Sequence, residues 1–108
     1  MSQECPNVDI TNEWGEGFNA RLPFTVDHNT DSSWTIHLGF DAKVDKLDCY
    51  QGRVSTSDGM NFDIDNLDWD GDLENGDTFT VEMLGYFSGG SRPKMVSATI
   101  DNQDICSS

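Results

Sequence analysis

The chain has 108 residues and a mass of 12.0 kDa, which suits one domain, and its 10% aromatic residues, with three tryptophans, argue against disorder. Six basic against twenty acidic side chains give a formal net charge of −14. Because such a polyanion repels phosphate backbones and anionic lipids, we expect no nucleic-acid or membrane binding, and partners that are neutral, cationic or metal ions.

The predicted elements are short strands separated by turns. Residues 8–12 and 18–26 alternate between polar and apolar side chains with the period of two that is typical of half-buried strands. Pro23 lies inside the second run and predicts an edge or bulged strand, because proline cannot donate to a sheet ladder. Residues 28–33 have the composition of a turn.

The clearest alternation follows at residues 34–40, and shorter strands are indicated around Val44, Leu47, Val54, Phe62 and Ile64, then at 78–84 and 95–100. No window of ten or more residues has helical periodicity. The spacing predicts a single all-β domain: an antiparallel β-sandwich, immunoglobulin-like or jelly-roll-like, with about eight or nine strands. Its core candidates are the apolar aromatic residues Phe18, Phe24, Trp34, Phe40, Phe62 and Phe79.

Three cysteines indicate the compartment. Cys5 and Cys106 lie near the two ends of the chain, which are often close in a compact domain, so we predict a disulfide between them and a reduced, shielded Cys49. The alternative is three reduced thiols in an intracellular protein. We favour a secreted protein, and because the first residues lack the features of a signal peptide, we expect the sequence to be a processed or recombinant fragment.

An acidic run from residue 66 to residue 77 raises the question of calcium. Read as a twelve-residue loop, it offers oxygen ligands at the positions that such loops use and a glycine at the sixth position. The flanks read as strands where that motif needs helices, so we favour a solvated loop and keep calcium as the minority hypothesis. Its ligands would be Asn66, Asp68, Asp70, Asp72 and Asp77.

The sequence gives little evidence of a catalytic site. No nucleophile elbow or glycine-rich phosphate loop occurs, and carboxylates without a pocket do not make an acid–base pair. His28 falls in a turn and His37 on the polar face of a strand, where both are expected at the surface. We therefore predict a non-catalytic domain without a cofactor, calcium apart.

Five short segments carry a recognisable order of motifs: 12–20 (NEWGEGFNA), 33–40 (SWTIHLGF), 67–73 (LDWDGDL), 75–78 (NGDT) and 98–106 (ATIDNQDIC). In that order they resemble carbohydrate-binding module family 2. The resemblance extends over residues 5–106, so we expect a module there with short tails at 1–4 and 107–108. The chain departs from the family in its acidity, in Ser33 before Trp34, and in Cys49-Tyr50, where the cellulose-binding subgroup has its middle surface tryptophan.

The resemblance implies a row of exposed aromatic rings, Trp14, Tyr50 and Trp69, on which the apolar faces of sugars stack. The glycines and Glu16 after Trp14, and the aspartates beside Trp69, agree with exposure, because an unpaired buried carboxylate is very costly. The alternative is a ring folded back onto the core. Polar side chains that would bond sugar hydroxyls are, by the same resemblance, Asn12, Arg21, Asp48 and Thr80; otherwise they are ordinary solvated strand residues.

The family resemblance implies a non-catalytic module that binds an insoluble β-1,4-linked polysaccharide, cellulose first and chitin second. Its partner would be a covalently linked catalytic domain of a secreted glycoside hydrolase. The alternative is an acidic extracellular matrix protein that binds chitin and calcium, which the net charge of −14 favours modestly.

Overall fold

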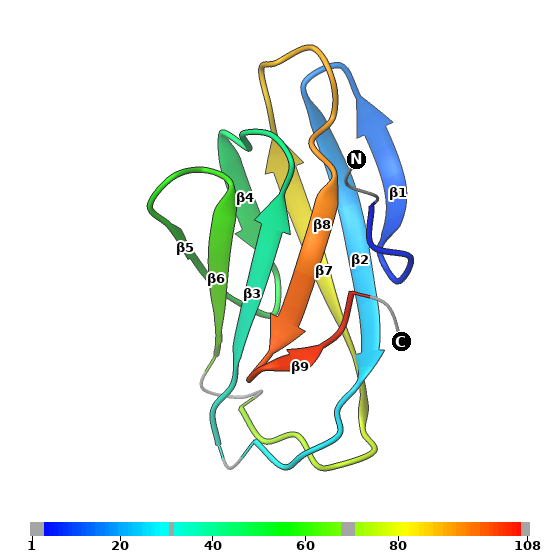
Figure 1. Ribbon diagram of the computed structural model, residues 1–108, viewed down its shortest axis with the longest axis vertical. Coiled ribbons are helices and arrows are strands. Elements are labelled where there is room, and N and C mark those ends of the chain that lie inside the picture. Colours follow the sequence, from blue (N-terminus) through cyan, green and yellow to red (C-terminus); the bar gives the residue numbers. More distant parts are fainter. Residues whose placement is uncertain (1–3, 31, 68–70, 107–108) are drawn as a thin grey trace.

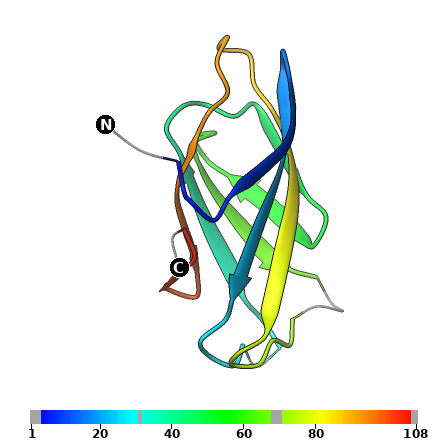
Figure 2. The ribbon, with the colours of Figure 1, turned by 90° about the vertical axis from the view of Figure 1, so that its right-hand side faces the viewer.

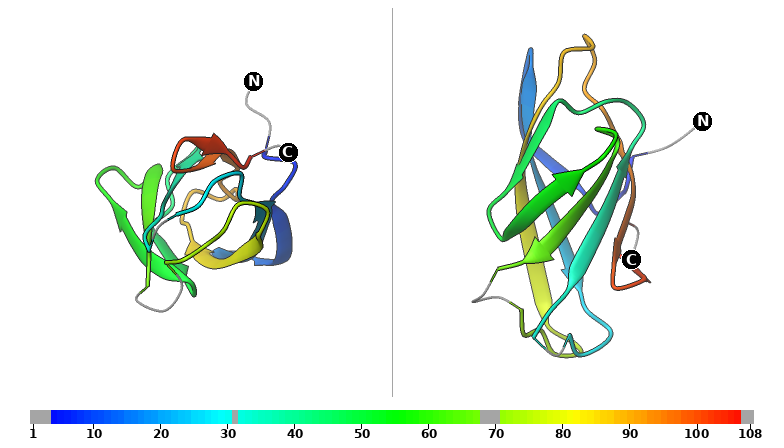
Figure 3. Two further views of the ribbon diagram at one scale, coloured as in Figure 1. Left: turned by 90° about the horizontal axis from the view of Figure 1, so that it is seen from below. Right: turned by 90° about the vertical axis from the view of Figure 1, so that its left-hand side faces the viewer.

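The structure is a computed structural model that describes residues 4–30, 32–67 and 71–106. Nine strands in these residues form two antiparallel sheets packed face to face (Figure 1, Figure 3), and none of the residues described is helical, which confirms the predicted β-sandwich. One sheet has the order β1 (Asp9–Trp14), β2 (Gly17–Thr25), β7 (Thr78–Tyr86), β4 (Lys46–Cys49). The other has the order β5 (Gly52–Thr56), β6 (Asn61–Asn66), β3 (Thr35–Phe40), β8 (Met95–Ile100), β9 (Gln103–Asp104).

Strand alternation produces the core. Successive side chains of a strand point to opposite faces, so every second residue of β2 and β3 enters the space between the sheets. Trp34, which directly precedes β3, is 1% exposed and meets the ring of Phe79 edge-on at 5.7 Å between centroids. The predicted core aromatics are confirmed: Phe18, Phe24, Trp34, Phe40 and Phe62 are buried, and Phe79 packs against them half-buried.

The prediction from Pro23 is wrong for its strand as a whole. β2 lies between β1 and β7 (Figure 2). Its pairing with β7 runs from Gly17 to Thr25 without a register shift. The proline is tolerated because the β1 ladder ends at the pair Asp9–Arg21, so β2 has no strand on that side at residue 23. A proline thus marks the exposed part of an otherwise central strand.

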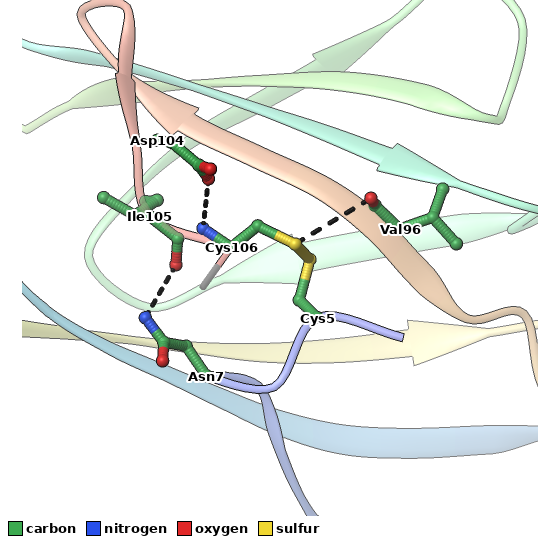
Figure 4. Close-up of a disulfide and its surroundings, with 6 residues drawn as sticks. All are labelled: Cys5, Asn7, Val96, Asp104, Ile105 and Cys106. Atoms are coloured by element: carbon green, nitrogen blue, oxygen red, sulfur yellow. Dashed lines mark hydrogen bonds between the residues drawn. A yellow bond between two sulfur atoms is a disulfide. The ribbon is translucent and has the colours of Figure 1, made fainter. Parts of the chain in front are cut away.

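The predicted Cys5–Cys106 disulfide is present and joins segments 101 residues apart in the sequence (Figure 4). Backbone hydrogen bonds support it: Cys5 donates to Met95 O at 2.7 Å, and Asn7 donates to Cys106 O at 3.1 Å. Closing a loop of about 100 residues removes unfolded-state entropy worth about 4.7 kcal/mol on the chain-entropy account. Cys49 takes no part in this disulfide and is half-buried, with its thiol 3.9 Å from Gln51 Oε1.

The two histidines lie on the surface, away from the core. The ring of His28 bonds Asp101 and Asp27, each at 3.0 Å, and the hydrogen bond to Asp101, followed by that to Asp27, raises the pKa of His28. His37 pairs with Asp63 on the outer side of the five-stranded sheet. No helix among the residues described is long and apolar enough to cross a bilayer.

Replacing Trp34 should test the core. Trp34→Ala removes the largest fully buried side chain among the residues described and leaves a cavity, so we expect a loss of about 3–5 kcal/mol in the free energy of unfolding, measured by denaturant titration. Ser33→Ala, at an exposed neighbour, should change it by about 0.5 kcal/mol or less. Equal effects of both would contradict the burial of Trp34.

Salt should stabilise this domain. Acidic side chains outnumber basic ones by twenty to six, and like charges such as Asp63 and Asp65 point outward from the same strand. Screening this repulsion with NaCl, from about 0.05 M to about 1 M, should raise the free energy of unfolding by about 1 kcal/mol, or Tm by about 4–8 °C. A constant or falling Tm in calorimetry would show that charge repulsion contributes little.

Candidate functional site

The outer face of the four-stranded sheet gathers the residues singled out in the sequence. Directly paired residues of an antiparallel sheet share a face, so the strand register arranges their side chains in rows. The first row is Trp14, Gly17, Tyr86 and Lys46, and the second is Asn12, Asn19, Leu84 and Asp48. The third is Asp9, Arg21 and Glu82.

A β-bulge puts Trp14 on this face. Ile10 pairs with Ala20, but Asn12 already pairs with Asn19, so Thr11 is an extra residue in β1. Without it, uninterrupted alternation would place Trp14 on the same side as Ile10, which packs against the core. The bulge resets the alternation and turns the indole outward.

Three strands hold the indole of Trp14, which is 39% exposed. It lies over Gly17 so closely that a Cβ at that position would come within 2.5 Å of its Cζ2 atom. Tyr86, itself 37% exposed, meets it edge-on, with centroids 6.3 Å apart and ring planes at 72°. The neighbouring Glu13 accepts a hydrogen bond from Arg92 Nε at 3.2 Å. Trp14 is therefore a supported surface ring.

Tyr50 provides a second aromatic position on the same face. It directly follows β4, donates its backbone N–H to Glu82 O at 3.1 Å, and is 61% exposed. Glu82 and Tyr86 are four positions apart in β7, so the two aromatic positions lie about 13 Å apart along the strands. Beside the Tyr50 ring is a recess of about 170 Å³, lined by Thr11, Asn19, Ala20, Arg21, Tyr50, Glu82 and Met83.

The predicted polar residues occupy the space around these rings. Asn12 and Asp48 lie in the second row, between the two aromatic positions, and Arg21 lies in the third. Thr80 pairs with Pro23 one row further along. The structure thus brings these four residues to one face with Trp14 and Tyr50; that they bind sugar stays a prediction.

Trp69, with Asp68 and Asp70, lies outside the described residues, so its predicted place in the row is untested. The residues flanking this segment are held by buried and half-buried polar groups. Asn66 Oδ1 accepts the backbone N–H of Trp34 at 3.0 Å, and Thr30 Oγ1 accepts that of Leu73 at 2.8 Å.

The calcium hypothesis is also untested at two of its ligands, Asp68 and Asp70. Among the residues that the structure describes, no group of three or more histidine, cysteine or acidic side chains could hold a metal ion. Asn66 Oδ1 already accepts a backbone hydrogen bond, and Asp77 Oδ2 accepts one from the N–H of Glu74 at 2.8 Å. Asp72 is exposed.

Tyr86 was missed by sequence reasoning. The signal was present: Val81, Met83 and Gly85 face the core, so Leu84 and Tyr86 point outward although both are largely apolar. Apolar residues on both faces of a strand indicate that the outer face has a partner or a function. Tyr86 contacts Trp14 because β7 pairs with β2 in this register, and the sequence of β7 alone does not predict that pairing.

The face as a whole suits a long hydroxylated ligand. Aromatic rings offer flat apolar contact at two separated positions, and amide, carboxylate and guanidinium groups between them can donate and accept hydrogen bonds. Its charges nearly balance: Lys46 and Arg21 stand against Asp9, Asp48 and Glu82. Most of the charge of −14 therefore lies elsewhere on the molecule.

Comparisons with known structures show the fold. The domain is similar to the chitin-binding domain of Chi18aC from Streptomyces coelicolor (TM-score 0.62, 22% identity, 87% of this chain and 86% of that one). It is also similar to the chitin-binding domain of a Pyrococcus furiosus chitinase (0.63, 17%, 91% and 95%). It resembles part of chitinase ChiA74 from Bacillus thuringiensis (0.65, 17%, 87% of this chain), spanning only 14% of that chain. No curated protein sequence matches.

The sequence pattern of the family described as cellulose binding domain matches residues 5–106. This range begins and ends at the two disulfide-bonded cysteines and includes both sheets. The fold, the exposed aromatic face and the family match agree with the resemblance that the motifs gave. The chain therefore belongs to the cellulose binding domain family, carbohydrate-binding module family 2, and is a non-catalytic carbohydrate-binding domain.

Proposed function

We propose that the outer face of the four-stranded sheet binds the surface of an insoluble β-1,4-linked polysaccharide. The observation that carries this proposal is the pair of exposed aromatic positions, Trp14 with Tyr86 and Tyr50, on one face about 13 Å apart along the strands. The axial C–H groups of a pyranose form an apolar plate that an aromatic ring covers with dispersion and hydrophobic contact. Two such stacking contacts with one polysaccharide chain raise the overall affinity, because the second contact forms within a complex that already exists.

The family favours cellulose as the polysaccharide. Chitin is the second candidate, because two of the similar folds belong to domains described as chitin-binding. Both polymers have the same β-1,4-linked backbone and offer the same stacking faces. Pull-down on microcrystalline cellulose, chitin and xylan in parallel would rank them, and binding to none of the three would overturn the proposed function.

The domain would anchor a larger secreted enzyme. Chitinase ChiA74 contains a fold like this one as a small part of its length, which supports a covalently linked glycoside hydrolase beside residues 5–106. The disulfide supports an oxidising compartment, as expected outside the cell. The alternative is an extracellular matrix protein that binds chitin and calcium, and the acidity of the chain favours it. A full-length precursor that encodes a catalytic domain would decide for the anchor.

Truncating the surface rings should separate binding from stability. Trp14→Ala, Tyr50→Ala and Trp69→Ala should each weaken binding by about 1–3 kcal/mol, the range of a desolvated aromatic anchor. Tyr50→Ala should change the free energy of unfolding by about 0.5 kcal/mol or less, because the ring is mostly exposed. Trp14→Ala should cost more, up to about 1 kcal/mol, because it also loses the Tyr86 contact.

Depletion isotherms on cellulose and chitin, paired with denaturant midpoints of the same proteins, measure both quantities. A variant of Trp14 or Tyr50 that unfolds the domain while binding per folded molecule is unchanged would show that the ring supports the fold and not the ligand. Phe79→Leu, a change in the half-buried part of the core, serves as the control for general destabilisation.

Binding to a neutral polysaccharide should be insensitive to salt. The rings make apolar contacts and the charges of the face nearly balance, so there is little attraction to screen. Between about 0.05 M and about 1 M NaCl, the affinity per folded molecule should stay within about twofold, with circular dichroism to confirm folding at each salt concentration. A steep loss of affinity would implicate the acidic surface instead.

A further inference from the structure

The recess beside Tyr50 holds opposite kinds of polar group at one place. Arg21 and Glu82 are direct partners across β2 and β7, and both line the recess together with Tyr50. A guanidinium can only donate hydrogen bonds, and a carboxylate can only accept them. The recess therefore offers a donor and an acceptor next to an exposed aromatic ring.

Within the described part of the chain, neither side chain uses these groups on the protein itself. The Arg21 guanidinium and the Glu82 carboxylate make no ion pair with each other or with another described residue, although register makes them neighbours. Glu82 is engaged only through its backbone, whose N–H donates to Gln51 Oε1 at 2.7 Å and whose carbonyl accepts from Tyr50. Both side-chain groups are thus available to a ligand.

We propose that this recess receives the C2 acetamido group of an N-acetylglucosamine unit whose ring stacks on Tyr50. Its carbonyl would accept from Arg21, and its N–H would donate to Glu82. This inference rests on the proposed function and names the polysaccharide: chitin in preference to cellulose. The family resemblance ranks cellulose before chitin, and this inference ranks chitin first.

The competing sugars use the recess less well. Glucose carries only a hydroxyl at C2, which can both donate and accept a hydrogen bond but is shorter than an acetamido group and extends less far into the recess. A deacetylated glucosamine unit carries an ammonium, which has donors only and the same charge as Arg21. The neutral amide matches both groups and costs less to desolvate than an ion.

Depletion isotherms on α-chitin, microcrystalline cellulose and chitosan test the proposal with the intact chain. Wild type should bind chitin about tenfold more tightly than cellulose, the value of one charge-assisted hydrogen bond. Arg21→Ala and Glu82→Ala should each weaken binding to chitin by about tenfold, and binding to cellulose by several-fold less, because only chitin places an amide in the recess. Lys94→Ala and Glu74→Ala remove the same charges at exposed loop positions, and both should leave binding to chitin and to cellulose unchanged.

Several results would overturn the proposal that the recess receives the acetamido group. They are equal affinity of wild type for chitin and cellulose, or equal losses on both polymers in the Arg21 and Glu82 variants. A third is tighter binding to chitosan than to chitin at about pH 5 in about 1 M NaCl, where the chitosan amines are charged but their general attraction to the acidic domain is screened. Each of these leaves the proposed function intact as long as Tyr50→Ala still weakens binding. No binding to any of the three polymers, by protein shown to be folded by its denaturant midpoint, would overturn both.

Discussion

The pairing of β2 with β7 supports both faces of the sheet to which the function is assigned. At one end of this pair, two glycines make room on opposite sides. Phe18 lies over Gly85 on the inner face, where a Cβ would meet the ring at 2.5 Å, and Trp14 lies over Gly17 on the outer face. The same register therefore seats a core ring below the sheet and a surface ring above it, and a slip by one residue would exchange the faces of every side chain in the strand.

Rigidity of the surface rings follows from this arrangement. The indole of Trp14 rests on Gly17 and contacts Tyr86 at its side, and Arg92 donates a hydrogen bond to the neighbouring Glu13. A ring that is already ordered loses little conformational entropy when a sugar covers it, so more of the stacking energy contributes to affinity. At the other end of the face, a backbone hydrogen bond to Glu82 fixes the chain at Tyr50.

The acidity of the chain is a property of the molecule and not of this face. On the outer side of the five-stranded sheet, Asp63 and Asp65 point into solvent, whereas the three carboxylates among the aromatic rows stand beside Arg21 and Lys46. A polysaccharide that covers a face removes water from it, and lone carboxylates there would lose hydration without compensation. Concentrating charge elsewhere keeps the domain soluble and leaves a nearly neutral face for a neutral polymer.

How much the sequence determined can be seen residue by residue. Alternation around Ile36 and Leu38, the motif around Trp14 and the terminal cysteines were enough for an all-β sandwich, a buried Trp34 and the Cys5–Cys106 bridge, because these depend on local periodicity and on the closeness of chain ends. The prediction of an edge or bulged strand from Pro23 was wrong for β2 as a whole, because β1 pairs with only part of β2 and leaves the segment at Pro23 without a neighbour on that side.

Only the tertiary structure placed the bulge at Thr11, the contact of Tyr86 with Trp14, and Glu82 opposite Arg21 beside Tyr50. Those relations join β1, β2, β4 and β7, which are far apart in the sequence. They are set by cross-strand register, which no single segment specifies.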